Sequence, residues 1–274
     1  MRLSILHKML VFILVPVAIA LEAVTVINYD ASRQAMEHQI GEELSLIVRG
    51  QKSEMDNTVN LLGSTMSNFA KSHTLHEYMK QRAAGADPAA LQQLEAQAFA
   101  EVRQIIEGFP LLRDVGILDA SGKVVIHSRR ELIGTDLSDR PFFQAALQGR
   151  VEPVTVIGKD REQLSSALGL PVKDGERTIG VIYGTLALEK LAASTTHRVH
   201  IGTTGICFVY DKNGILLMHP NTAYVGDDDS KLPWVQHMQN TPSGEYRYTW
   251  AGKDKLAHYE HVPMVDWLII VSVE

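Results

Sequence analysis

The chain has 274 residues and a formal net charge of −6, from 26 basic and 32 acidic residues, and 45% of it is hydrophobic. This composition fits a globular protein with a sizeable core, and the acidic balance argues against a nucleic-acid partner. The single cysteine, Cys207, excludes an intramolecular disulfide and Cys-rich zinc sites, and its apolar neighbours predict a buried thiol.

The N-terminal segment predicts a membrane anchor. Residues 9–28 are apolar with Glu22 as their only charge, and their length is close to the ~20 residues that span a bilayer as a helix. Arg2 and Lys8 precede the span, so we expect residues 1–8 in the cytoplasm and the rest of the chain outside the inner membrane. A cleaved signal peptide ending near Ala20, which would give a secreted periplasmic binding protein, is the alternative.

Residues 29–75 predict one long stalk helix. Apolar residues recur there at steps of three and four, which marks one helical face. Such a helix cannot bury its stripe alone, so we expect it to form a homodimer near the membrane through Ile40, Leu44, Ile47, Met55 and Leu62.

Two later stretches match each other without a gap. Asp119 and Gly122 stand between two apolar runs, as do Asp211 and Gly214, and the offset is 211 − 119 = 92. The same offset relates other Gly, Pro and aromatic positions, which predicts a duplicated unit: Gly134 with Gly226, Pro141 with Pro233, Phe142 with Trp234, and Pro171 with Pro263.

Each unit predicts an antiparallel sheet with a helix on one face, an α+β fold. The Asp-x-x-Gly step is a hairpin turn, and a short helix follows at residues 140–147 or 232–238. Further strands are expected at residues 164–173, 178–188, 244–250, 255–262 and 267–273.

With this layout, the chain resembles the double Cache sensor family of bacterial receptors, most of all methyl-accepting chemotaxis proteins. The resemblance rests on the anchor, the long helix and the stretches 118–124, 134–143, 180–191, 201–205, 211–220 and 267–273. It implies two PAS-like modules, a membrane-distal one at residues 76–195 and a membrane-proximal one at residues 196–274. It also implies dimerisation through the helices and a small ligand in the distal module, whose occupancy is signalled into the cell. A histidine kinase or a diguanylate cyclase is the alternative to a chemoreceptor as the signalling output.

Arg140 leads the candidate binding residues. Pro141 is favourable in a helix's first turn, so part of this motif is structural. An Arg beside two aromatic rings, Phe142 and Phe143, is also how a site holds a carboxylate, and the matching family residues commonly do so. Core packing is the alternative for the rings. The weaker candidates are His127, Arg129, Ser165, Tyr183 and Thr185.

Charge decides the expected ligand class. Thr185 stands where amino-acid-sensing members of the family carry the Asp that binds the ligand's ammonium, and residues 154–158 lack the family's Tyr and Asp pair. Because no acidic partner for an ammonium can be placed, a small organic anion without an amine is favoured. In the second unit Leu232 replaces Arg140, so we expect only the first unit to bind ligand.

No sequence motif indicates an enzyme, a metal site or a cofactor. His258 and His261 are three positions apart on a strand and would face opposite sides. Residues 227–229 are acidic but lack further oxygen ligands at calcium-binding spacing. A nucleophile elbow is also missing, so we expect neither catalysis nor a bound cofactor.

Overall fold

The structure, a computed structural model, describes residues 5–150, 153–157 and 164–274. Residues 1–46 and residues 47–274 form two separate units. Three helices come first: α1 (Ile5–Ala70), α2 (His73–Ala83) and α3 (Pro88–Gly108). α1 ends before the expected residue 75 because Ser72 caps a new helix, its Oγ accepting a hydrogen bond from the Leu75 N–H at 3.2 Å.

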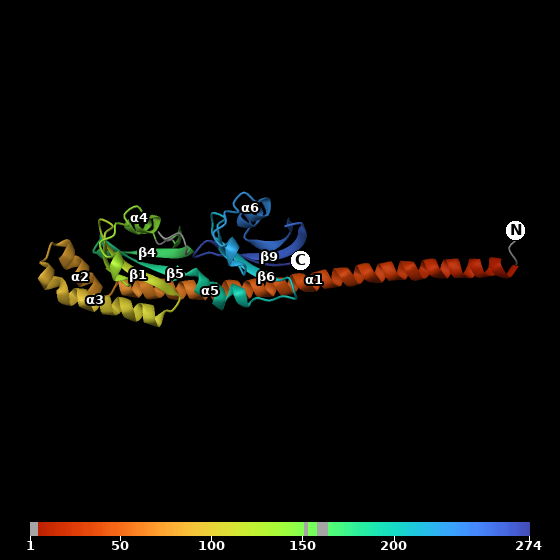
Figure 1. Cartoon of the computed structure of the whole chain (residues 1–274), viewed down its shortest axis with the longest axis horizontal. Coiled ribbons are helices and arrows are strands. Elements are labelled where there is room, and N and C mark those ends of the chain that lie inside the picture. Colours follow the sequence, from red (N-terminus) through yellow and green to blue (C-terminus); the bar gives the residue numbers. More distant parts are fainter. Residues whose placement is uncertain (1–4, 151–152, 158–163) are drawn as a thin grey trace. The chain divides into compact units, whose positions relative to one another are not determined.

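Two five-stranded antiparallel sheets follow, each with a short helix across one face (Figure 1). The first has the order β2-β1-β5-β4-β3 and is covered by α4 (Pro141–Leu147); its strands are β1 (Leu112–Asp119), β2 (Val124–His127), β3 (Pro153–Ile157), β4 (Leu164–Asp174) and β5 (Arg177–Ala187). The second has the order β7-β6-β10-β9-β8 and is covered by α6 (Pro233–Gln239); its strands are β6 (Ile206–Tyr210), β7 (Leu216–Met218), β8 (Ser243–Trp250), β9 (Lys253–Val262) and β10 (Trp267–Val273).

Shorter helices join these parts: η1 (Arg130–Leu132), α5 (Leu188–Ser194), η2 (Thr196–Arg198) and η3 (Thr222–Tyr224). The predicted α+β class is confirmed. The bounds of the expected strands differ only at the ends, but β3 was not among those strands.

The duplication holds in detail over the first half of each unit. Ile117 pairs with Ile126 in one hairpin, and Val209 pairs with Met218 in the other, at the offset of 209 − 117 = 92. Both hairpins carry a bulge at the same place, and both turns use a glycine with positive φ, Gly122 at 92° and Gly214 at 82°.

The offset changes in the last strands. Gly116 pairs with Tyr183, and its equivalent Phe208 pairs with Ile270, so here the offset is 270 − 183 = 87. Pro171 lies inside β4, whereas Pro263 follows the end of β9. The expected match between these prolines is therefore wrong in three dimensions, because the second unit is shorter after its helix.

The apolar stripe of α1 packs within the chain. Met55 and Leu62 are 0% and 2% exposed, and Met66 lies against Gly184 of β5. The stripe's period was predicted correctly, but Met55 and Leu62 cannot contact a second copy because the folded part of the same chain already covers them. On another face of the helix, Leu61 is 58% exposed.

Candidate functional site

Strand register places most of the predicted site residues on one face of the first sheet. Asp114 of β1 pairs with Thr185, and Gly116 pairs with both His127 and Tyr183. Directly paired residues share a face, and so do residues two apart in a strand. By the same rule Ser165 joins them, because Ala167, two residues on, pairs with Thr185. This is the face that α4 covers, since Phe142 stacks on Tyr183; we call it the α4 face.

Aromatic rings line the covered part of the α4 face. The rings of Phe142 and Tyr183 are stacked with centroids 4.8 Å apart, and His127 lies 5.8 Å from Tyr183. A Cβ on Gly116 would stand 2.4 Å from the Tyr183 ring and 2.7 Å from the His127 ring, so only glycine lets both rings lie against β1. Phe143 is 1% exposed and packs in the same apolar cluster, as the core-packing alternative predicts.

Two buried side chains on this face have a donor without a partner. The Nδ1 of His127 accepts a hydrogen bond from the Arg129 N–H at 2.9 Å, so the proton of the neutral ring lies on Nε2. Within the described residues, neither this Nε2–H nor the Tyr183 hydroxyl makes a hydrogen bond. The two residues are 1% and 4% exposed, but neither donor atom is itself fully buried, because Gln51 Oε1 is the one such unpaired atom in the described part of the chain. Burial lowers the pKa of His127 and raises the pKa of Tyr183, which keeps both groups neutral.

Arg140 adds a charged donor at the start of α4. Its side chain is 28% exposed and contacts the exposed carboxylate of Asp139 at 3.9 Å. Its guanidinium has no hydrogen-bond acceptor in the part of the chain that the structure describes. The positive charges of Arg140 and Arg129 both act to lower the pKa of Tyr183, against the larger effect of burial, so Arg140 lies within electrostatic reach of the phenol. Ser165, 5% exposed, likewise has no partner for its hydroxyl among the described residues.

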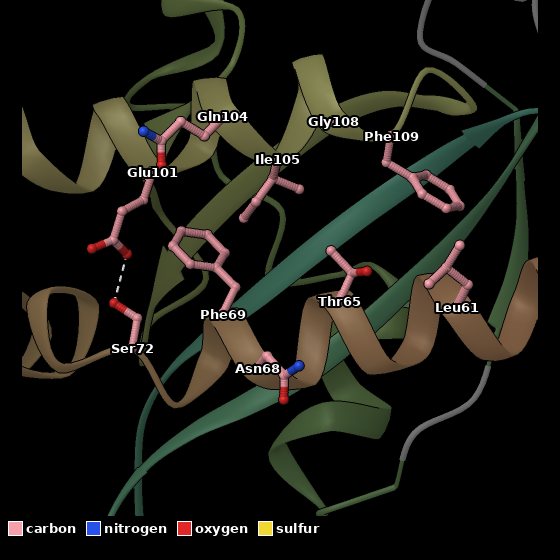
Figure 2. A pocket seen from close by; sticks show the side chains of 10 residues that line it. All are labelled: Leu61, Thr65, Asn68, Phe69, Ser72, Glu101, Gln104, Ile105, Gly108 and Phe109. Atoms are coloured by element: carbon pink, nitrogen blue, oxygen red, sulfur yellow. Dashed lines mark hydrogen bonds between the residues drawn. The ribbon is translucent and has the colours of Figure 1, made fainter.

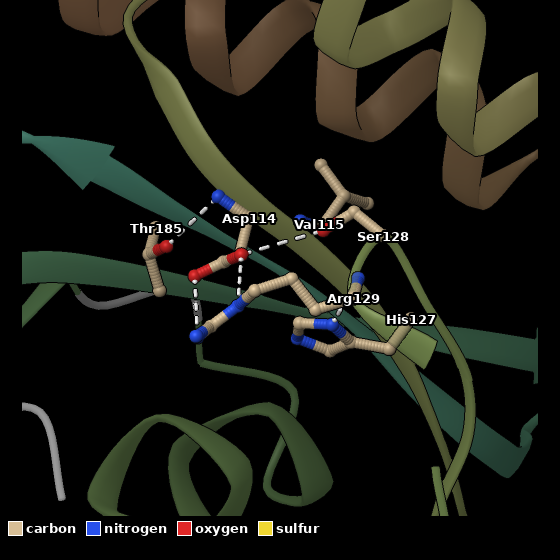
Figure 3. Close-up of polar contacts among 6 residues, drawn as sticks. All are labelled: Asp114, Val115, His127, Ser128, Arg129 and Thr185. Atoms are coloured by element: carbon tan, nitrogen blue, oxygen red, sulfur yellow. Dashed lines mark hydrogen bonds and ion pairs between the residues drawn. The ribbon is translucent and has the colours of Figure 1, made fainter. Parts of the chain in front are cut away.

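The sequence analysis missed Asp114. Figure 3 shows its carboxylate facing the Arg129 guanidinium, whose Nε and Nη2 donate to the two carboxylate oxygens at 2.8 and 3.0 Å. Thr185 accepts the Asp114 N–H through Oγ1 at 3.2 Å. The sequence analysis could place no acidic partner for an ammonium, whereas the structure has an acid, Asp114, on this face, and Arg129 is its paired cation. The available signal was an Asp directly before the apolar run Val115–Leu118 of β1, since a buried acid is rare unless it is paired.

Comparison with known proteins decides the family. Residues 32–274 match the family model of the Cache domain, in the form named dCache_1. The chain belongs to the Cache domain family.

The methyl-accepting chemotaxis protein McpA of Bacillus subtilis is 31% identical to this Cache domain over 97 residues, which is 35% of this chain and 14% of that protein. The chain thus matches only a small part of McpA. The ligand-binding domain of the Pseudomonas aeruginosa chemoreceptor PctB, in complex with L-Arg, is 17% identical with a TM-score of 0.63 over 86% of this chain and 96% of that one. The sensor domain of the V. cholerae histidine kinase DctB is 14% identical with a TM-score of 0.66 over 87% and 98%. Both show the same fold.

The histidines considered for metal binding are engaged in other contacts in this Cache domain. His258 Nε2 lies 3.2 Å from the Glu245 carboxylate, and His261 Nε2 lies 3.0 Å from the carbonyl oxygens of Met238 and Thr241. Among the described residues, no group of three His, Cys, Asp or Glu side chains is arranged to hold a metal ion. The stretch 154–158, where the sequence lacks the family's Tyr and Asp pair, ends at residue 158, which lies outside the described residues.

A groove separate from the α4 face lies between α1 and α3. Its volume is about 470 Å³, and Figure 2 shows the rings of Phe69 and Phe109 and the side chains of Leu61 and Ile105 pointing into it. At one end the Ser72 hydroxyl donates a hydrogen bond to Glu101 at 2.6 Å. The groove is thus apolar in its middle and polar at one end.

Proposed function

We propose that this chain is the sensing region of a bacterial transmembrane receptor of the chemoreceptor kind, and that it binds a small organic carboxylate on the α4 face. One observation carries the ligand class: the unpartnered groups described on this face can all donate a hydrogen bond, namely Arg140, the Nε2–H of His127 and the hydroxyls of Tyr183 and Ser165. In the part of the chain that the structure describes, Gln51 Oε1 is the one fully buried polar side-chain atom without a partner, so these donors stay open to a ligand rich in hydrogen-bond acceptors.

The charges on this face support an anion. Arg129 is already neutralised by Asp114, so Arg140 is the cation left to meet a ligand's carboxylate in two-pronged fashion. Phe142, stacked on Tyr183, would supply the apolar wall that excludes water. Ser165 and Thr185 would complete the site at the open end of the face.

An α-amino acid is the second candidate ligand. PctB, which shares the fold, is in complex with L-Arg, and Asp114 is an acidic group of the kind that an ammonium needs. The ammonium would have to displace Arg129 from that carboxylate, which is why the plain acid is preferred here.

The membrane arrangement belongs to the same proposal. Among the described residues one helix is long and apolar enough to span a membrane, with the apolar window near the N-terminus. We place residues 1–8 in the cytoplasm, 9–28 in the inner membrane, and the stalk at 29–75. The distal module at 76–195 and the proximal module at 196–274 then lie outside. A native product that starts at Leu21 would favour the secreted binding protein instead.

Dimerisation is proposed through the groove between α1 and α3. Leu61 lines the groove and is 58% exposed, so a two-fold axis would let each copy insert its Leu61 into the groove of the other. We expect Leu61→Arg to convert a dimer into a monomer in sedimentation of the full chain in detergent. Ser64→Arg, at an exposed position of the same helix, is the matched control.

The ligand proposal is tested by calorimetric titration of the full chain in detergent with monocarboxylates, dicarboxylates, amino acids and amines. Carboxylates without an amine should bind most tightly. Bound ligand should shift the equilibrium between two conformations of the module, and α1 would transmit that change to the membrane. Tightest binding of simple amines would refute the anion site.

A further inference from the structure

The ion pair between Asp114 and Arg129 is unequal in its burial. The Asp114 side chain is 7% exposed, whereas the Arg129 side chain is 50% exposed. Figure 3 shows the guanidinium reaching the carboxylate from the side on which His127 lies. The acid is therefore fixed inside the module, while its counter-ion is the part open to exchange.

Asp114 depends on Arg129 for its charge balance. Both carboxylate oxygens accept from the guanidinium, and among the described residues the only other side-chain donor is the Ser128 hydroxyl at 3.4 Å. Over residues 5–150, 153–157 and 164–274, no second cation contacts this carboxylate. A buried carboxylate without a cation is costly, so loss of Arg129 would leave a site that attracts another positive group.

The carboxylate of Asp114 also lies beside the proposed ligand. Asp114 pairs with Thr185 on the α4 face, and Arg129 donates its backbone N–H to His127, one of the unpartnered donors. The internal guanidinium thus occupies the position next to the donors where a ligand's ammonium would meet a carboxylate.

We propose that Arg129 is a specificity-determining residue: it acts as a built-in cation that masks Asp114, so that the site accepts organic acids and rejects the corresponding amino acids. This inference rests on the proposed function, because it concerns the same face. The Arg129 guanidinium competes with any ammonium in solution for the Asp114 carboxylate. Because the guanidinium is tethered beside that carboxylate, its effective concentration is high, which favours it over a dilute ligand.

The test uses pairs of probes that differ by one α-amine: propionate and alanine, 4-methylpentanoate and leucine, succinate and aspartate. Their affinities are measured by calorimetry on the full chain in detergent. The variants are Arg129→Gln, the double variant Asp114→Asn/Arg129→Gln, and Arg130→Gln. Arg130 is the matched control, because it neighbours Arg129 in sequence but its guanidinium lies over the Phe99 ring at 5.0 Å.

In Arg129→Gln, the amino member of a pair should gain on the order of ten-fold in affinity over its value in the unmodified chain, which corresponds to about 1.4 kcal/mol. The double variant should lose this gain, because the attracting charge is gone, and Arg130→Gln should behave like the unmodified chain. An unchanged affinity for the amino members in Arg129→Gln, or a gain that persists in the double variant, would overturn the inference.

If Arg129→Gln does not fold, Asp114→Asn gives a second test. It frees the Arg129 guanidinium, so succinate should bind about ten-fold more tightly and the amino acids should not gain. Unchanged or weaker succinate binding would contradict the masking role. Failure of the proposed function would look different: the unmodified chain would bind none of the acids. The affinity of the amino acids for Arg129→Gln can still be measured in that case.

Discussion

The two sheets of this Cache domain share a fold but fill the same positions with opposite chemistry. On the face under the short helix, Asp114, Gly116 and Tyr183 of the first sheet correspond to Ile206, Phe208 and Ile270 of the second. Arg140, just before α4, corresponds to Leu232, just before α6. The second unit therefore has apolar side chains where the first has two charged groups, a tyrosine hydroxyl and a glycine without a side chain.

Hydrogen bonding repeats the contrast. In the second sheet the Tyr210 hydroxyl donates to Asp229 at 2.6 Å and the Tyr248 hydroxyl donates to Ser272 at 3.1 Å. In the first sheet the Tyr183 hydroxyl has no such partner among the described residues. One fold can thus serve as a closed structural support or as a binding site, depending on whether its buried donors find partners inside the chain.

The largest effect is expected from Trp234→Ala in α6, the helix that covers the second sheet. Trp234 stacks on Tyr248 with centroids 4.5 Å apart and is 8% exposed, so its truncation should destabilise the fold by about 3–5 kcal/mol. Urea unfolding measures this loss, and carboxylate affinity should stay the same in the folded fraction. A large loss of affinity with little loss of stability would mean that the second sheet binds the ligand.

Arg140→Ala should act in the reverse way. Two charge-assisted hydrogen bonds to a carboxylate are worth a few kcal/mol together, so we expect a loss of affinity of about 100-fold with little change in stability. Arg140→Lys keeps the charge without the two-pronged geometry, so its carboxylate affinity should lie between those of the unmodified chain and Arg140→Ala. Acid binding that survives Arg140→Ala would keep the ligand class but remove Arg140 from the site.

Gly116→Ala moves the first sheet one step toward the second. The new Cβ would stand 2.4 Å from the Tyr183 ring, so that ring must shift. We expect a destabilisation of about 1–3 kcal/mol, typical of overpacking, together with weaker ligand binding. Thermal unfolding and calorimetry measure the two effects, and a variant that keeps both properties would show that the rings are not held as described.

The smallest effect is a pH dependence common to both sheets. Burial lowers the pKa of His127 in the first sheet and of His219 in the second, so each is neutral in the folded chain and takes up a proton more readily when unfolded. Stability should be full above the unfolded value of about 6.5 and fall as the pH drops below it. His127→Gln should lessen this fall in acid unfolding curves, and an equal or steeper fall would contradict the assignment.

Local signals made much of the fold predictable. The turns at Gly122 and Gly214 need a positive φ, and Pro141 and Pro233 fit the first turn of a helix, so a few residues determine each element. The spacing of three and four along α1 correctly indicated a buried face. It could not tell whether the covering partner is the same chain or a second copy, because both give the same period.

The site was predictable only in part. Tyr183 and Thr185 are two apart in a strand, which places them on one face from the sequence alone. The pairing of Asp114 with Arg129 depends on how β1 and β2 fold back on one another, and no spacing rule joins an acid in one strand to an Arg beyond the next. Which donors stay unpaired is likewise decided by packing across strands.

The last strand of each unit lies in the middle of its sheet. β5 is held by β1 and β4, and β10 is held by β6 and β9, with ladders along both edges. A pull along β10 would load both ladders in shear at once, instead of peeling them open one bond at a time as at a sheet edge. The second sheet would then resist such a pull as one block.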